Sequence, residues 1–297
     1  GNCIGGPCYL PSMAQGEDHV EDFLGMVGVP FEHTPDFPST AKCLFLTVQA
    51  HKDPEIIEKL RAYISAGGKA VVTSGFIIEG LGKGIEEMTS IRYRGRRYRT
   101  NCFRGTAFMG GADEYSRHEM GFPLLEHRNN TTWAIAKAVV GEENYPIILR
   151  DNYGKGELVT LVVPDEYGYI YDLPENILNQ IRSQFTSVVP YTLTGPGQAS
   201  LFAYDNDTFA IYKYTDGIKP GRYGISLRGN ADSITLLTGR GRTIKPRSKG
   251  MGRSNFNLFI QPGDLNFFKI CWSENWFEEE RPFVAISAPN DYDEDDD

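Results

Sequence analysis

The chain has 297 residues, 40% hydrophobic and 23% charged, and a formal net charge of −9, which fits a globular protein with room for two domains. Its acidity argues against nucleic acid as a main partner. No apolar run approaches the roughly 18 residues of a membrane span. Part of the negative charge lies in Asn290–Asp297, NDYDEDDD, a type of run that is normally solvated and disordered.

The first part of the chain alternates predicted strands and helices. Cys3–Pro11 is expected to be an opening strand, and the apolar spacing within Val20–Val27 predicts a helix. Val29–Glu32 restarts as a strand, and Cys43–Thr47 has the composition of a strand buried on both faces. Strand and helix alternation of this kind is typical of a doubly wound α/β unit.

The stretch Leu60–Gly75, LRAYISAGGKAVVTSG, continues this pattern. It predicts the end of an amphipathic helix, a turn at Gly67 and a buried strand over Ala70–Thr73. Ser74 follows at the carboxyl end of that strand, where open α/β sheets place ligands and nucleophiles. Ser74 is therefore the first candidate for a working site.

The next segments close the expected α/β domain. Ile85–Met120 is rich in arginine and glycine, with short alternating pieces that predict an antiparallel excursion beside the sheet. Thr132–Val140 is expected to be a helix. Pro146–Arg150 and Leu158–Val163 predict a hairpin, and Pro174–Val188 predicts an amphipathic helix.

After residue 194 the sequence predicts only strands. Six short strands between Ala199 and Trp272 are separated by turn residues, a spacing typical of a β-sandwich. We therefore expect an α/β domain over residues 1–194, a β-sandwich over 195–288 and an acidic disordered tail over 289–297.

Several segments resemble the glutamine-amidotransferase-like domain that trimerises certain β-galactosidases, which a small β-sandwich follows. They are CLFLT, LRAYISAGGKAVVTSG, YGKGELVTLVVP, ITLLTG and FIQPGDLNFF. The resemblance implies a flavodoxin-like, class I glutamine-amidotransferase-like doubly wound sheet. It also implies a homo-oligomer, contact with carbohydrate and an upstream catalytic domain in the same polypeptide. Nothing in this sequence resembles the catalytic barrel of those enzymes, which carries their two catalytic glutamates.

The wider amidotransferase family has a nucleophilic cysteine where this chain has Ser74, so the resemblance makes amidotransferase activity doubtful. If Ser74 is a nucleophile, the amides of Gly75 and Phe76 can form an oxyanion hole. The base is then His118 or His127, oriented by Glu119 or Glu126. The alternative is that Ser74 caps the following helix, a common role for serine.

Other polar residues are candidate ligand-binding groups. Glu17 and His19 begin a helix close to the expected sheet edge, and Gln49 follows a buried strand, so we expect these side chains, with Gly75 and His118, to line a ligand crevice. His19 and Glu21 could join His127 and Glu126 as metal ligands, but acidic residues also favour helix N-termini without any ligand.

The five cysteines have no zinc-site spacing, although Cys3 and Cys8 could pair across a turn. We expect neither a metal ion nor a cofactor.

The sequence favours a non-catalytic region of a carbohydrate-active protein, with scaffold and oligomerisation roles and a glycan contact. One alternative is a hydrolase that uses Ser74 with a histidine base, and another is a module that binds a small ligand without turnover. The compartment stays open, with a periplasmic or extracellular location favoured.

Overall fold

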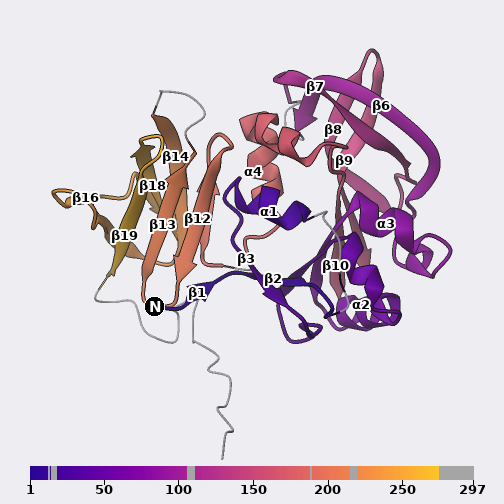
Figure 1. The fold of residues 1–297 in the computed structure, drawn as a ribbon, viewed down its shortest axis with the longest axis horizontal. Coiled ribbons are helices and arrows are strands. Elements are labelled where there is room, and N and C mark those ends of the chain that lie inside the picture. Colours follow the sequence, from indigo (N-terminus) through magenta and orange to yellow (C-terminus); the bar gives the residue numbers. More distant parts are fainter. Residues whose placement is uncertain (13, 15–18, 106–110, 188, 215–219, 274–297) are drawn as a thin grey trace, which may run out of the picture.

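The computed structural model describes residues 1–12, 14, 19–105, 111–187, 189–214 and 220–273. Of these residues 49% lie in strands and 18% in helices, and the strands form three sheets. The predicted doubly wound, flavodoxin-like α/β class is therefore wrong, because the protein is mostly β. Figure 1 shows a sandwich of strands on the left and a larger sheet with the helices on the right.

The larger sheet has nine strands: β2 (Gly6–Tyr9), β3 (Phe31–Thr34), β4 (Cys43–Leu46), β5 (Lys69–Thr73), β6 (Arg92–Gly105), β7 (Glu114–Glu126), β8 (Thr132–Val140), β9 (Glu143–Tyr153) and β10 (Gly156–Leu161). Their order across the sheet is β3-β2-β4-β5-β10-β9-β8-β6-β7. Pairs from β3 to β10 are parallel, and pairs from β10 to β7 are antiparallel. The sheet is thus mixed, with a parallel half and an antiparallel half.

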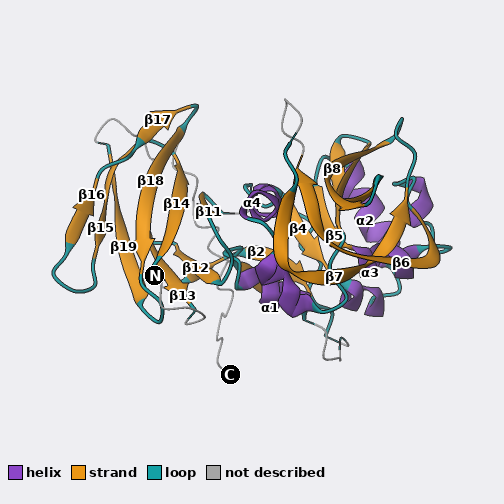
Figure 2. Cartoon of the chain, turned by 90° about the horizontal axis from the view of Figure 1, so that it is seen from above, coloured by secondary structure: helices purple, strands orange, loops and turns teal. Residues whose placement is uncertain are grey.

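The helices of the described residues all lie with the larger sheet (Figure 2). They are α1 (Val20–Gly25), α2 (Ile56–Ser65), α3 (Ser74–Gly80), α4 (Glu175–Ser183) and the 3-10 helices η1 (Val48–Lys52), η2 (Ile85–Glu87) and η3 (Tyr167–Asp172). Within the described part of the chain, no helix has the length and apolar character needed to cross a membrane.

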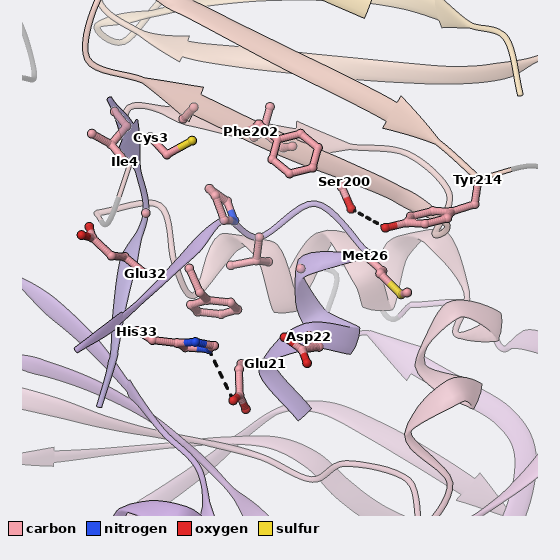
Figure 3. A pocket seen from close by; sticks show the side chains of 17 residues that line it. Cys3, Ile4, Glu21, Asp22, Met26, Glu32, His33, Ser200, Phe202 and Tyr214 are labelled. Atoms are coloured by element: carbon pink, nitrogen blue, oxygen red, sulfur yellow. Dashed lines mark hydrogen bonds and ion pairs between the residues drawn. The ribbon is translucent and has the colours of Figure 1, made fainter. Parts of the chain in front are cut away.

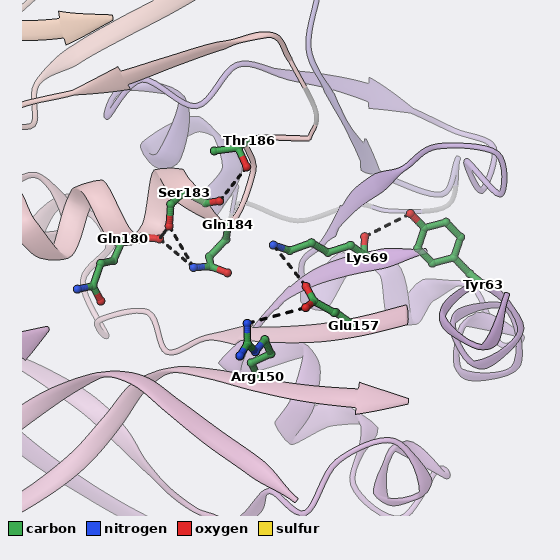
Figure 4. Close-up of polar contacts among 8 residues, drawn as sticks. All are labelled: Tyr63, Lys69, Arg150, Glu157, Gln180, Ser183, Gln184 and Thr186. Atoms are coloured by element: carbon green, nitrogen blue, oxygen red, sulfur yellow. Dashed lines mark hydrogen bonds and ion pairs between the residues drawn. The ribbon is translucent and has the colours of Figure 1, made fainter. Parts of the chain in front are cut away.

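The stretch Leu60–Gly75 has the predicted helix, turn and strand. Helix α2 ends before Gly67, which has φ +113°, a conformation that glycine adopts without Cβ strain. The ring of Tyr63 covers Gly68 so closely that a Cβ there would lie 2.3 Å from the ring. The Tyr63 hydroxyl also donates to the Lys69 carbonyl, 3.2 Å away, at the start of β5 (Figure 4).

The antiparallel half explains why the fold class differs from the prediction. The antiparallel excursion expected over Ile85–Met120 is confirmed, since β6 and β7 form a long hairpin that joins the main sheet. Thr132–Val140, however, is strand β8 and not a helix. It pairs with β6 on one side and β9 on the other, so hydrogen bonds to its neighbours outweigh the helix propensity of its alanines.

The expected β-sandwich is confirmed. One sheet has six strands in the order β1-β12-β13-β19-β15-β16, and the other has four in the order β11-β14-β18-β17. Their bounds are β1 (Cys3–Ile4), β11 (Tyr191–Thr194), β12 (Ala199–Tyr204), β13 (Thr208–Lys213), β14 (Gly221–Arg228), β15 (Ala231–Leu236), β16 (Arg242–Ile244), β17 (Ser248–Gly250), β18 (Arg253–Ile260) and β19 (Leu265–Trp272).

The predicted opening strand Cys3–Pro11 is divided at Gly5. Strand β1 pairs with β12 of the sandwich, whereas β2 pairs with β3 and β4 of the larger sheet. A Cβ at Gly5 would lie 2.6 Å from the Phe31 backbone, so the two backbone segments are too close there for a side chain. Two buried apolar clusters result, one from residues 8–185 and one from 191–270. The domain boundary at residue 194 stays a prediction, and the tail lies outside the described residues.

Arg182 of α4 connects the two clusters. Its guanidinium is buried and donates to the carbonyls of Val27, at 2.6 Å, and of Gly195 and Pro196, at 2.5 and 2.8 Å. Burial lowers the pKa of Arg182 to about 10. One side chain therefore holds the end of α1 against the segment that enters the sandwich.

We expect Arg182→Ala to lower the free energy of unfolding by at least about 3 kcal/mol, because the buried carbonyls of Val27 and Gly195 lose their donor at once. Urea unfolding followed by tryptophan fluorescence measures the loss. The exposed Arg96→Ala is the control and should stay within about 0.5 kcal/mol of the parent. Equal midpoints for the two variants would show that the buried contacts contribute nothing.

Candidate functional site

Ser74 lies where β5 ends and α3 begins, at the carboxyl edge of the parallel strands. The expectation that Ser74 caps the helix is wrong, since Thr73 does so and its Oγ1 accepts the amide of Phe76 at 3.2 Å. Ser74 is 1% exposed, and its hydroxyl oxygen accepts the amide of Val163, 3.2 Å away, just beyond β10. The hydroxyl therefore ties the end of β10 to the start of α3.

A cavity of about 190 Å³ lies beside Ser74. Gly75, the expected oxyanion-hole residue, lines it together with Arg97 and Asp165. The two charged side chains are paired, since Arg97 Nε donates to Asp165 Oδ2 at 3.1 Å. The charges of Arg97 and Asp165 at this cavity therefore neutralise each other.

The predicted histidine bases have other partners. His118 Nδ1 pairs with Asp172, and His127 forms a hydrogen bond with Asn129. Burial lowers the pKa of His127, which favours its neutral form. Among the described residues, neither histidine lines the cavity at Ser74. The catalytic set of Ser74, His127 and Glu126 stays a prediction.

The remaining predicted residues have separate surroundings. Glu126 Oε2 lies 3.1 Å from Arg94 Nε in an exposed ion pair. Gln49 is buried in η1, and its Oε1 has no hydrogen-bond partner among the described residues. Glu17 lies outside the described residues. Their roles in ligand binding stay predictions.

Glu21, in the first turn of α1, is the centre of a polar cluster that includes the predicted residue His19. Glu21 Oε1 lies 2.9 Å from His19 Nδ1 and 3.5 Å from His33 Nε2. Ligand atoms of Cys8, Glu21 and His33 all lie within 4.8 Å of one another. Cys8 of β2 is opposite His33 of β3 in the parallel register, so both reach the same edge of the sheet.

The sequence analysis missed Cys8 and His33 as partners of Glu21. A sequence signal did exist, because Cys8 and His33 are possible metal ligands near the ends of two consecutive predicted strands. The register of those strands, however, was unknown. Cys8 is a buried free thiol and Cys3 an exposed one, so the pairing between them does not form. Burial, with the nearby charges of Glu21 and Asp22, raises the pKa of the Cys8 thiol well above its usual value.

A larger cavity, of about 610 Å³, lies between the larger sheet and the sandwich (Figure 3). Asp22, Glu32 and His33 line it from one side. Phe202 and Tyr214 line it from β12 and the end of β13. The cavity therefore combines carboxylates, an imidazole and aromatic rings from two separate cores.

The arginine-rich strand β6 does not present a purely basic surface. Four of its arginines are paired with acidic residues: Arg94 with Glu126, Arg97 with Asp165, Arg99 with Glu119 and Arg104 with Asp113. Since most of these carboxylates come from the same hairpin or its surroundings, the local positive charge is largely compensated.

A family model described as "Uncharacterized protein SSO3021, second domain" matches residues 4–166. The match covers more than half of the chain, so the chain belongs to this family. No curated protein sequence matches this chain. The matched region contains the larger sheet, including the clusters around Ser74 and Glu21.

Solved structures of two enzymes are similar in fold to this chain. The α-L-fucosidase isoenzyme 2 of Paenibacillus thiaminolyticus is 15% identical, with a TM-score of 0.55, over 92% of this chain and 49% of that enzyme. The β-galactosidase of Bacillus circulans sp. alkalophilus is 13% identical, with a TM-score of 0.46, over 90% of this chain and 41% of that enzyme. The chain thus spans about half the length of the fucosidase, and it has a fold that occurs within a glycoside hydrolase.

We expect Ser74→Ala to lower the free energy of unfolding by about 1–3 kcal/mol, because the half-buried Val163 amide loses its acceptor, the oxygen of the buried Ser74. Denaturant unfolding measures the change, with the exposed Ser65→Ala as the matched control. If Ser74→Ala is as stable as Ser65→Ala, the hydroxyl has no structural role.

Proposed function

We propose that this chain is a non-catalytic region of a carbohydrate-active protein, where it serves as a scaffold for a homo-oligomer and contacts glycans. The observation that carries the proposal is the state of Ser74, the residue that the sequence analysis offered as a nucleophile. A serine nucleophile needs a base within about 3 Å, and its oxygen must reach the substrate. The Ser74 oxygen is instead buried and accepts the Val163 amide.

The likeness to the fucosidase supports the context of this proposal. The chain corresponds to 49% of that enzyme, and in this proposal it is part of a longer polypeptide whose other part carries the reacting groups. An upstream catalytic domain is the partner that the β-galactosidase resemblance implies. The scaffold would then hold copies of that polypeptide together, as a closed symmetric oligomer.

The 610 Å³ cavity supports the glycan contact. Its volume lies within the range of about 300–1,000 Å³ that is usual for small-ligand sites. Phe202 offers a ring to the apolar face of a sugar, and the carboxylates of Asp22 and Glu32 accept hydrogen bonds from sugar hydroxyls.

The assembly part of the proposal predicts a dimer or trimer in light scattering. It also predicts no labelling of the chain by a fluorophosphonate probe, because the Ser74 oxygen is buried and accepts the Val163 amide. A monomer at every concentration would remove the scaffold role. Labelling that disappears in Ser74→Ala would instead establish the hydrolase alternative.

The glycan part predicts a rise in melting temperature with at least one sugar of a panel that includes galactosides and fucosides. Phe202→Ala should abolish the shift, because the cavity loses its stacking ring. Phe259→Ala is the matched control: it also removes an exposed sandwich phenylalanine, but one outside the cavity lining. No shift with any sugar, or equal loss in both variants, would contradict glycan binding in this cavity.

A further inference from the structure

We propose that Cys8, Glu21 and His33 form a binding site for one divalent transition-metal ion of the Zn²⁺ class. The three residues come from β2, α1 and β3, and their ligand atoms lie within 4.8 Å of one another. The sequence-based expectation was that the chain has no metal site, since its cysteines have no zinc spacing. A site assembled from neighbouring strands leaves no such spacing.

The distances fit metal ligands better than a direct bond between the side chains. His33 Nε2 and Glu21 Oε1 are 3.5 Å apart, beyond the usual hydrogen-bond length of about 2.7–3.2 Å. Tetrahedral zinc with N and O ligands at about 2.0–2.2 Å places those two atoms about 3.3–3.6 Å apart. The observed separation therefore matches two ligands of one ion, and the Cys8 sulfur lies within 4.8 Å of a ligand atom of each.

The strongest pointer to a ligand is an unpartnered oxygen. Glu21 is 2% exposed, and its Oε2 is buried without a hydrogen-bond partner in the described part of the chain. His19 and His33 both approach Oε1, so pairing of the carboxylate with either imidazole does not provide a partner for Oε2. A buried carboxylate oxygen without a donor is destabilising, and a bound cation beside it would remove that cost.

The donor set selects the kind of metal. A thiolate and an imidazole together favour Zn²⁺ and similar ions, whereas Mg²⁺ and Ca²⁺ prefer oxygen ligands. Three protein ligands leave one position of a tetrahedral ion open, as in many zinc sites that bind water or a small molecule. Glu21 and His33 also line the 610 Å³ cavity, so the open position would face that space.

His19 would act as a positioning residue in this site. Its Nδ1 lies 2.9 Å from Glu21 Oε1, and when that nitrogen carries its proton it fixes the carboxylate so that Oε1 faces His33 and Oε2 stays beside the ion. Loss of such an outer partner typically weakens metal binding by about 10- to 100-fold. Loss of a direct ligand should weaken it further.

The test uses the full, untagged chain, stripped of metal with a chelator and then titrated with Zn²⁺. We expect one equivalent of zinc to remain after desalting, measured by elemental analysis, and a thiolate-to-cobalt charge-transfer band when Co²⁺ replaces zinc. His33→Ala should lose the zinc, and Cys8→Ser should lose the cobalt band. His19→Gln should weaken zinc binding by about 10- to 100-fold.

Cys43→Ser is the matched control, because Cys43 is another buried free thiol, on the neighbouring parallel strand β4. It should keep both the zinc and the cobalt band. His33 is half exposed, so His33→Ala tests the site even if Cys8→Ser does not fold, and circular dichroism checks the fold of each variant. The proposal is overturned if the parent chain retains no zinc, or if folded His33→Ala retains as much as the parent.

Discussion

The buried guanidinium of Arg182 is the contact on which the arrangement of the two cores depends. It joins the carbonyl of Val27, just after α1, to those of Gly195 and Pro196, on the way into β12. The planar guanidinium has five donors in a fixed geometry and can bind several carbonyls that lie in different directions. Removing the charge from water costs free energy, as the lowered pKa indicates, and the three carbonyls offset that cost.

The position of the candidate sites follows from this contact. Helix α1 carries Glu21, and β12 carries Phe202, so the segments that Arg182 holds together form opposite walls of the 610 Å³ cavity. The division of the opening strand at Gly5 adds a second connection, because β1 belongs to one sheet and β2 to another. A shift of either core would change the cavity and the surroundings of Glu21 together.

The carboxyl edge of the parallel strands carries both polar sites, as the general rule for such sheets expects. At the end of β5, the Ser74 hydroxyl has become part of the framework through the Val163 amide. At the ends of β2 and β3, Glu21 keeps an oxygen without a partner among the described residues. An unsatisfied buried group is costly to maintain, and so the second position is the better place to look for a ligand.

Local sequence was sufficient for the elements whose cause is local. The helix, glycine turn and buried strand of Leu60–Gly75 and the strands of the sandwich follow from apolar spacing, glycine conformation and turn residues. The sequence by itself also determined which chemistry-bearing side chains the chain has. Only the tertiary structure decided that Thr132–Val140 is a strand, because its conformation depends on pairing with β6 and β9. Likewise, Cys8, Glu21 and His33 meet only through the register of two parallel strands and the placement of α1, and such long-range contacts leave no periodic trace in a single sequence.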